Sequence, residues 1–251
     1  MLTKTRPTKA VTIGVRKAPA PDDRPGFIRI DSVHQGDWDG TKGLYHINAV
    51  DCVTQWEVVA TVQTISEAHL LPVIEQMLAQ FPFEILGFHA DNGSEYVNHR
   101  VAQMLDKLRI EFTRSRPRRS NDNGLAETKN GAVVRKLFGY EHIPQRHATR
   151  FNTFCIEYLN PFLNFHRPCL FSTDKPDPKK PGRIKRVYRA QDAKTPLDKL
   201  ASLPEAATFL REGVRLEDLH ALATALSDVQ AAEELNEARL ALFRRVPART
   251  G

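Results

Sequence analysis

Three acidic residues stand where strands and helices could bring them together. Asp31 lies within an apolar strand-like run, Asp91 ends another such run, and Glu127 falls in the first turns of a helix-forming segment. A carboxylate among apolar strand residues is costly to bury unless a cation or hydrogen-bond donors meet it. Carboxylate oxygens without His or Cys suit Mg²⁺ or Mn²⁺ and argue against zinc. The pattern therefore predicts a divalent-metal site made by these three side chains.

Other acids near Asp31 compete for the first position. Asp37 and Asp39 lie close to it in the chain, and Asp51 also follows an apolar run. We favour Asp31 because a carboxylate in mid-strand can face the strand that bears Asp91, whereas Asp51 is expected to begin a turn. Taken alone, each of Asp31, Asp91 and Glu127 could instead be a strand-end or helix-capping acid.

The elements that must position these residues follow from hydrophobic periodicity. Residues 27–33, 44–50 and 56–62 are rich in β-forming residues and are separated by turns, which predicts an antiparallel meander. Beyond them the pattern predicts, in order, a helix from Ser66, a strand over 84–91, a helix near 101–108, a strand over 110–113 and a helix from about Asn123 to Phe138. This order predicts an α/β fold with a mixed sheet flanked by helices.

Composition divides the chain into four parts. Residues 1–25 are basic and proline-rich, which is typical of a flexible lead-in, and residues 26–170 hold the sheet-and-helix core. A basic linker is expected over 171–190 and a helical region over 191–251.

Overall composition excludes several classes of protein. With 41% hydrophobic and 26% charged residues the chain is an ordinary globular protein, and no apolar run is long enough to cross a membrane. Its three cysteines, at wide spacing, match neither a disulfide framework nor a zinc pair, and residues 1–24 lack a signal peptide. We therefore expect a reduced, cytoplasmic location.

The charge is unevenly distributed. The formal net charge of +6 divides into +8 over residues 1–189 and −2 over residues 190–251. A basic body of this kind favours a polyanionic partner such as nucleic acid.

Two segments resemble the signatures of the retroviral-type integrase and insertion-sequence transposase superfamily. They are His89-Ala90-Asp91-Asn92-Gly93-Ser94-Glu95-Tyr96 and the run from Ser115 to Glu127. Thirty-five residues separate Asp91 from Glu127, which is the D,D-35-E spacing of that superfamily, and the interval from Asp31 to Asp91 also fits. The later stretches 164–168 and 180–188 are similar to segments that follow the core in its bacterial branch. The resemblance covers residues 20–200, approximately.

The resemblance implies a ribonuclease H-like mixed five-stranded sheet and a DDE-type polynucleotidyl transferase. It carries over residue by residue to Asp31, Asp91 and Glu127 as ligands of two Mg²⁺ ions, for which Mn²⁺ could substitute. The implied reaction is hydrolytic nicking of DNA ends followed by direct transfer of the freed 3′-hydroxyl to target DNA. It also implies double-stranded DNA as the partner, both as element ends and as target, a homo-oligomer, and association with a bacterial nucleoid.

A basic cluster beside the third helix is expected to hold DNA phosphates. Its members are Arg114, Arg116, Arg118, Arg119, Lys129, Arg135 and Lys136. A solvated basic face is the alternative. The positions one and two turns after Glu127 are Gly131 and Val134 or Arg135, where retroviral relatives carry two lysines, so contacts from this helix stay open. His89 and His166 are expected to have structural roles.

Two other functions stay open at this point. One is a ribonuclease H-like nuclease that cleaves without joining, and the other is a non-catalytic, truncated transposase remnant that only binds DNA or oligomerises. Relatives usually place a helix-turn-helix region before the core, yet only 26 residues precede Phe27. Such a region is therefore expected to be missing or separately encoded, which leaves open whether this chain acts alone.

Overall fold

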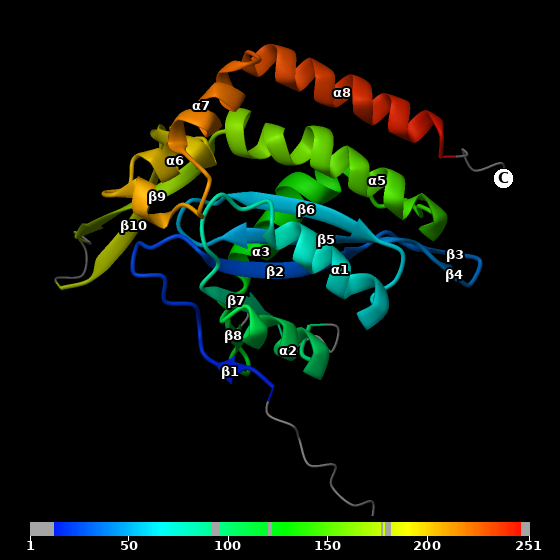
Figure 1. Cartoon of the computed structure of the whole chain (residues 1–251), viewed down its shortest axis with the longest axis horizontal. Coiled ribbons are helices and arrows are strands. Elements are labelled where there is room, and N and C mark those ends of the chain that lie inside the picture. Colours follow the sequence, from blue (N-terminus) through cyan, green and yellow to red (C-terminus); the bar gives the residue numbers. More distant parts are fainter. Residues whose placement is uncertain (1–12, 92–95, 120–121, 177, 179–181, 247–251) are drawn as a thin grey trace, which may run out of the picture.

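A mixed β-sheet forms the centre of the molecule. The computed structural model describes residues 13–91, 96–119, 122–176, 178 and 182–246. Five strands of the sheet match the expected ones, namely β2 (Phe27–His34), β5 (Tyr45–Asp51), β6 (Glu57–Val62), β7 (Gly87–Ala90) and β8 (Glu111–Arg114). Their order across the sheet is β8-β7-β2-β5-β6, with β2 in the middle (Figure 1).

Strand directions complete the expected architecture. Strands β2, β5 and β6 form the antiparallel meander, whereas β7 pairs parallel with β2 and β8 pairs parallel with β7. The predicted α/β fold, a mixed sheet flanked by helices, is thereby confirmed.

A sixth strand extends the sheet beyond the expected five. β1 (Val15–Arg16) lies within the segment expected to be a flexible lead-in and pairs parallel with β8, Val15 opposite Thr113. Two residues are too few to show strand alternation in the sequence. The pairing covers an edge whose backbone N–H and C=O groups would otherwise face solvent.

Helices cover both faces of the sheet. α1 (Glu67–Leu78) and α2 (His99–Lys107) lie on one face. On the other face a continuous helix comprises α3 (Gly124–Lys129), the π-helical η2 (Asn130–Arg135) and α4 (Lys136–Phe138), close to the predicted span. A short turn η3 (Gln145–His147) leads into a second long helix made of α5 (Ala148–Phe154), η4 (Cys155–Leu159) and η5 (Phe162–His166).

Alternation along β2 divides the core in two. Ile28 and Ile30 are buried in the cluster that contains α1 and α2, whereas Val33 is buried against η2 and α5. Because successive strand side chains point to opposite faces, Asp31 faces the α3–η2 layer together with Val33. The sheet therefore presents its candidate metal ligand to the helix that carries Glu127.

The C-terminal part begins with a hairpin and ends in helices. β9 (Cys169–Pro176) and β10 (Ile184–Lys194) pair antiparallel, so the linker expected over 171–190 is largely a β-hairpin. The sequence did not reveal it because most residues of both strands are exposed and leave no apolar alternation. The expected helical region comprises α6 (Pro196–Ala201), η6 (Ala206–Phe209), α7 (Leu216–Thr224) and α8 (Asp228–Arg244).

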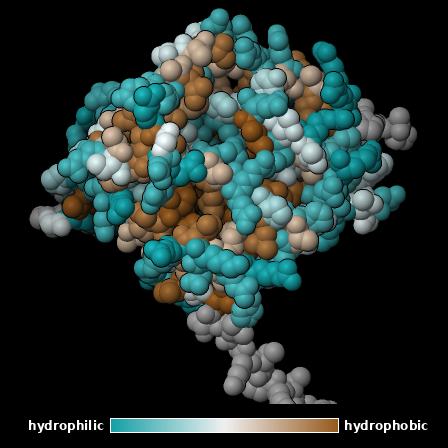
Figure 2. Space-filling view, in the orientation of Figure 1, coloured by the Kyte–Doolittle hydropathy of each residue, from teal (hydrophilic) through white to brown (hydrophobic). Residues whose placement is uncertain are grey.

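Helix α8 lies along α5 in Figure 1, and the ring Nδ1 of buried His166 lies 3.0 Å from Asp228 Oδ1, which ties the two helical layers together. A small hairpin, β3 (Asp37–Trp38) with β4 (Thr41–Lys42), extends from the other end of the sheet. Across the described ranges, no helix is long and apolar enough to cross a bilayer. The face shown in Figure 2 is mostly hydrophilic, with apolar side chains gathered near its centre.

Candidate active site on one face of the sheet

Asp31 and Asp91 each follow one of two paired residues in neighbouring strands. In the parallel pair of β2 and β7, Ile30 lies opposite Ala90, and both are buried on the α1–α2 side. Asp31 is the next residue of β2, and Asp91 directly follows the end of β7, so strand alternation predicts that both side chains point to the opposite face. Both are half-buried. Extending the β2–β7 register by one residue would place Asp91 opposite Asp31.

Hydrogen bonds hold the helix of Glu127 across β2. The Asn123 side-chain amide donates to the backbone oxygen of Ile30 at 3.0 Å, and the Asn130 amide donates to Asp31 Oδ2 at 2.7 Å. Glu127 lies between them, about one turn from each. Its side chain is exposed. The helix is thus fixed at two points around Glu127, directly over the strand that carries Asp31.

The three acids form a donor set suited to a hard cation. All their side-chain donors are carboxylate oxygens, the ligands that Mg²⁺ prefers. Asp31 is also oriented by its neighbours, since Ser32 N–H donates to Oδ1 at 2.8 Å while Asn130 donates to Oδ2. Within the described parts of the chain, no three His, Cys, Asp or Glu side chains already form a metal-binding group. The donor chemistry fits a divalent ion, whose binding would have to bring the three carboxylates closer to one another.

The competing acids have other partners. Asp51 is fully buried and accepts hydrogen bonds from Gly26 N–H and from the N–H and hydroxyl of Thr54, as expected of a turn residue. Burial raises the pKa of Asp51, and these hydrogen bonds oppose the rise. Asp37 lies 3.1 Å from the Nε2 atom of His34, and Asp39 is an exposed turn residue with φ of 51°. None of these carboxylates shares the face with Asp91 in the way that Asp31 does.

Part of the predicted basic cluster is exposed near the site. Arg118 and Arg119 lie in the turn before the helix, and Lys136 lies on its last turn; all three are exposed. The Arg116 guanidinium instead donates two hydrogen bonds, of 2.9 and 2.8 Å, to the Asp122 carboxylate. These bonds hold the pKa of that carboxyl well below its usual range. This pair braces the turn that precedes Glu127.

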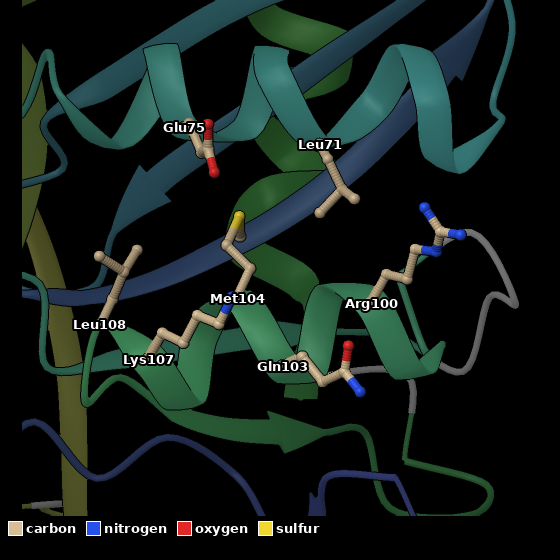
Figure 3. Close-up of a pocket in the computed structure, with 7 residues that line it drawn as sticks. All are labelled: Leu71, Glu75, Arg100, Gln103, Met104, Lys107 and Leu108. Atoms are coloured by element: carbon tan, nitrogen blue, oxygen red, sulfur yellow. The ribbon is translucent and has the colours of Figure 1, made fainter.

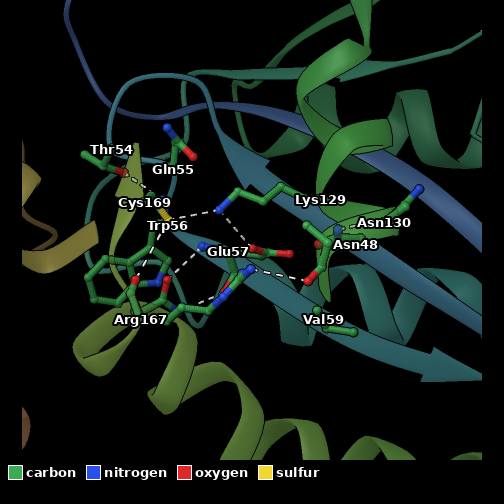
Figure 4. Close-up of polar contacts among 12 residues, drawn as sticks. Asn48, Thr54, Gln55, Trp56, Glu57, Val59, Lys129, Asn130, Arg167 and Cys169 are labelled. Carbon is green, nitrogen blue, oxygen red and sulfur yellow. Dashed lines mark hydrogen bonds and ion pairs between the residues drawn. The ribbon is translucent and has the colours of Figure 1, made fainter. Parts of the chain in front are cut away.

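Three other members of the cluster are less accessible than expected. The prediction for Lys129 has to be corrected. Its Nζ is buried, 3.3 Å from Glu57 Oε2 and 3.1 Å from Cys169 Sγ (Figure 4), so the expectation that it binds DNA is wrong. Side chains two residues apart on an α-helix point about 200° away from each other around the helix axis. Lys129 therefore points into the fold, whereas Glu127 points outward. Arg114, on β8, is half-buried.

Arg135 is engaged within the fold. Its guanidinium donates to the backbone oxygen of His34 at 2.9 Å and lies 4.8 Å from the centre of the Tyr140 ring. The side chain is half-buried, so these contacts use much of the group that was expected to meet a phosphate.

Two polar residues behind the site were missed by sequence reasoning. Asn48 lies opposite Asp31 on β5 and donates to Asn130 Oδ1 at 3.1 Å, and Glu57 begins β6 and pairs with Lys129. Burial raises the pKa of Glu57, and the charge of Lys129 opposes the rise. Asn48 lies between the apolar residues Ile47 and Ala49, and Glu57 directly precedes the apolar pair Val58-Val59, which is the pattern that could have revealed them.

His89 has the structural role that was expected. It is buried, with Nδ1 2.9 Å from Thr113 Oγ1 and Nε2 3.3 Å from Ser115 Oγ. Burial lowers its pKa to about 4, so the ring is neutral near pH 7. Asn92, Gly93 and Glu95 of the resembling segment lie outside the described residues.

A hollow of about 480 Å³ lies between α1 and α2, away from the carboxylates (Figure 3). Its lining mixes the charged Glu75, Arg100 and Lys107 with Leu71 and Met104. Since α1 and α2 cover the face opposite Asp31, this hollow is not part of the candidate active site.

Parts of this chain are similar to known proteins. Residues 23–120 match the family model described as integrase core domain. The uncharacterized protein y4rM of Sinorhizobium fredii (strain NBRC 101917 / NGR234) is 33% identical over 129 residues, which are 51% of this chain and 37% of that protein. The chain thus spans little more than a third of the length of this curated relative.

Solved structures of integrases are also similar to the chain. The catalytic core domain of BIV integrase is 18% identical, with a TM-score of 0.42, over 57% of this chain and 85% of that one. The HTLV-2 integrase catalytic core domain in complex with magnesium, in its trimeric form, is 16% identical, with a TM-score of 0.40, over 57% and 88%.

The family match contains Asp31 and Asp91, and Glu127 follows its end by seven residues. Residues 23–120 of this chain are therefore similar to an integrase core domain.

Proposed function

We propose that this chain is a DNA transposase or integrase that nicks DNA ends and joins the freed 3′-hydroxyl to target DNA. One observation carries the proposal: the hydrogen bonds of Asn123 and Asn130 fix the helix of Glu127 over Asp31, in the strand that pairs with β7, which Asp91 directly follows. The integrase core domain match supports the same class of reaction.

Asp31, Asp91 and Glu127 would hold the divalent ions. Two bound Mg²⁺ ions, or Mn²⁺ in their place, would supply charge that activates an attacking oxygen and stabilises the leaving oxygen of an in-line displacement. The chain's own contribution is to orient the ligands. Asn130 and Ser32 N–H each bind one oxygen of Asp31, which fixes its carboxylate plane.

The reaction needs no covalent protein intermediate. In the first step water attacks a phosphodiester and leaves a free 3′-hydroxyl, and in the second step that hydroxyl attacks a target phosphodiester and displaces a 3′-oxygen. One P–O bond forms and one breaks in each step. The exposed side chains of Arg118, Arg119 and Lys136 would contact phosphates of the DNA, and a homo-oligomer would pair two DNA ends.

A plasmid assay tests the proposal. The purified chain is incubated with supercoiled plasmid, Mg²⁺ and a labelled duplex that carries the terminal sequence flanking its gene, and both nicked circles and label joined to the plasmid are measured. We expect both products from the wild-type chain and neither from Asp91→Asn or Glu127→Gln.

The control is Asp39→Asn, which removes an exposed carboxylate in the β3–β4 turn and should keep both products. Undiminished activity in Asp91→Asn or Glu127→Gln would contradict the assignment of these ligands. Nicked circles without joined label would indicate a ribonuclease H-like nuclease, and DNA binding with neither product would indicate a non-catalytic remnant.

A further inference from the structure

The β9–β10 hairpin projects from the body of the molecule beyond the integrase core domain match (Figure 1). β9 has eight residues, so at about 3.3 Å per residue the hairpin is about 25 Å long. Most of its described side chains are exposed, including those of Ile184 and Tyr188. A two-stranded hairpin with little packing against the rest of a protein contributes little to stability, because such hairpins are only marginally stable in water. We therefore considered a functional role for its exposed surface.

Most of the chain's excess positive charge lies in this segment. Residues 169–194 contain eight basic and three acidic residues, a net charge of +5 in a chain whose net charge is +6. Six of the basic residues are described, namely Lys175, Arg183, Lys185, Arg186, Arg189 and Lys194. Among the described residues, none of these six forms an ion pair with a carboxylate. Within the described ranges, ion pairs therefore leave the positive charge of the hairpin without compensation.

The register of the hairpin adds to this charge. Lys185 lies directly opposite Lys175, so two like charges project from the same face. Like charges at opposed positions of an antiparallel pair are destabilising. On the other face Arg186 lies opposite Asp174, beside exposed Tyr188. A bound polyanion would offset the repulsion between the two lysines.

The base of the hairpin is fixed beside the candidate active site. Cys169 Sγ accepts from the Nζ of Lys129, which is two residues beyond Glu127, and Gln55 Nε2 donates to the Leu170 backbone oxygen at 2.9 Å (Figure 4). Lys199 Nζ lies 5.3 Å from the centre of the Phe171 ring. A duplex bound at the carboxylates would therefore have the root of a basic hairpin next to it.

We infer that the β9–β10 hairpin is an arm that binds the phosphate backbone of duplex DNA outside the active site. The inference rests on the proposed function for its choice of duplex DNA as the polyanion. At about 3.4 Å per phosphate along one strand, a 25 Å arm spans about seven base pairs. DNA binding by the arm requires neither the metal-binding carboxylates nor the reaction. It can therefore be measured separately from catalysis.

Fluorescence anisotropy of a labelled 30-base-pair duplex tests the arm in EDTA, where DNA is not cut. The full chain is compared with a variant in which four basic residues of the arm become glutamine, namely Lys175, Lys185, Arg186 and Arg189. We expect binding at least tenfold weaker at 100 mM salt. The slope of log affinity against log salt should become shallower by about 0.9 for each lost phosphate contact.

A matched control neutralises four exposed arginines at the far end of the molecule, on α5, the turn before it and the end of α8. These are Arg146, Arg150, Arg244 and Arg245. The control should bind within about twofold of wild type. A conservative variant that exchanges lysine and arginine at the same four arm positions keeps the charge, and it too should bind like wild type.

Three results would overturn the inference: equal binding by the arm variant and the control, weak binding by the conservative variant, or an arm-dependent preference for single-stranded RNA of the same length. Failure of the arm is distinguishable from failure of the proposed function. If the wild-type chain nicks and joins DNA but the arm variant binds DNA as well as wild type, only the inference about the arm is rejected. Arm-dependent binding in a chain that neither nicks nor joins would reject the proposed function and keep the arm.

Discussion

Asn130 connects the first carboxylate to the neighbouring strand through one amide group. Its Nδ2 donates to Asp31 Oδ2, and its Oδ1 accepts from Asn48 Nδ2, so the amide cannot rotate without losing both contacts. Residues three apart on a helix share a face, so its position after Glu127 could have identified Asn130 from the sequence. Its partner Asn48 could not be found that way, because the contact depends on how strands pair.

Replacing Asn130 with alanine should weaken Mg²⁺-dependent nicking. Groups that orient metal ligands typically contribute 10- to 100-fold in metal affinity or activity, and we expect a loss of about that size. A Mg²⁺ titration of the nicking rate should show a higher half-maximal concentration. Thr128→Ala, in the same helix but exposed, should behave like wild type. An unchanged Mg²⁺ dependence in Asn130→Ala would show that this amide does not position Asp31.

At the scale of elements, a buried ion pair joins the Glu127 helix to the sheet. Lys129 and Glu57 are both buried and 3.3 Å apart, and the same Lys129 Nζ reaches the first residue of β9. Helix, strand and hairpin therefore meet at one ammonium group. Removing one partner of a buried pair leaves the other charge without compensation.

Lys129→Met should therefore lower the free energy of unfolding by about 3–5 kcal/mol. The double variant Lys129→Met with Glu57→Gln removes both charges and should recover a large part of that loss. Urea unfolding followed by circular dichroism measures both. If the double variant were as unstable as Lys129→Met, the loss in the free energy of unfolding would not come from the unpaired Glu57 carboxylate.

Sequence patterns predicted the elements that are largely buried. The meander follows from runs rich in β-forming residues, and the helix from Gly124 to Phe138 follows from apolar periodicity. The β9–β10 hairpin carries no such periodicity because most of both strands is exposed. The burial of Lys129 depends on a partner 72 residues earlier in the chain, which no local pattern contains.

At the scale of the whole molecule, buried histidines make stability depend on pH. His46 is fully buried, with Nδ1 2.9 Å from Thr61 Oγ1, and burial lowers its pKa to about 3. Its ring also stacks on Phe138 at 4.2 Å, across the layer between sheet and helix. With His89, this gives two rings that stay neutral in the folded chain where unfolded histidines, with pKa near 6.5, would be protonated.

Stability should accordingly fall as the pH falls. Below about pH 6.5 the unfolded chain binds protons that the folded chain excludes, so the free energy of unfolding falls by up to about 1.4 kcal/mol per pH unit for each histidine. Between pH 7 and pH 5 we expect a loss of about 2 kcal/mol from His46. Urea unfolding of His46→Gln should show a fall smaller by that amount, and an equal fall in both proteins would contradict the assignment.

The central claim is that Asp31, Asp91 and Glu127 act as one metal-dependent unit within the integrase core and the helix laid across it. Rates of Mg²⁺-dependent plasmid nicking by Asp91→Asn, Glu127→Gln and the double variant test it most directly. Groups that act together are strongly non-additive, so each single variant should lose at least about 1,000-fold and the double variant should lose little more. Substantial activity in either single variant, or losses that multiply in the double variant, would contradict the claim.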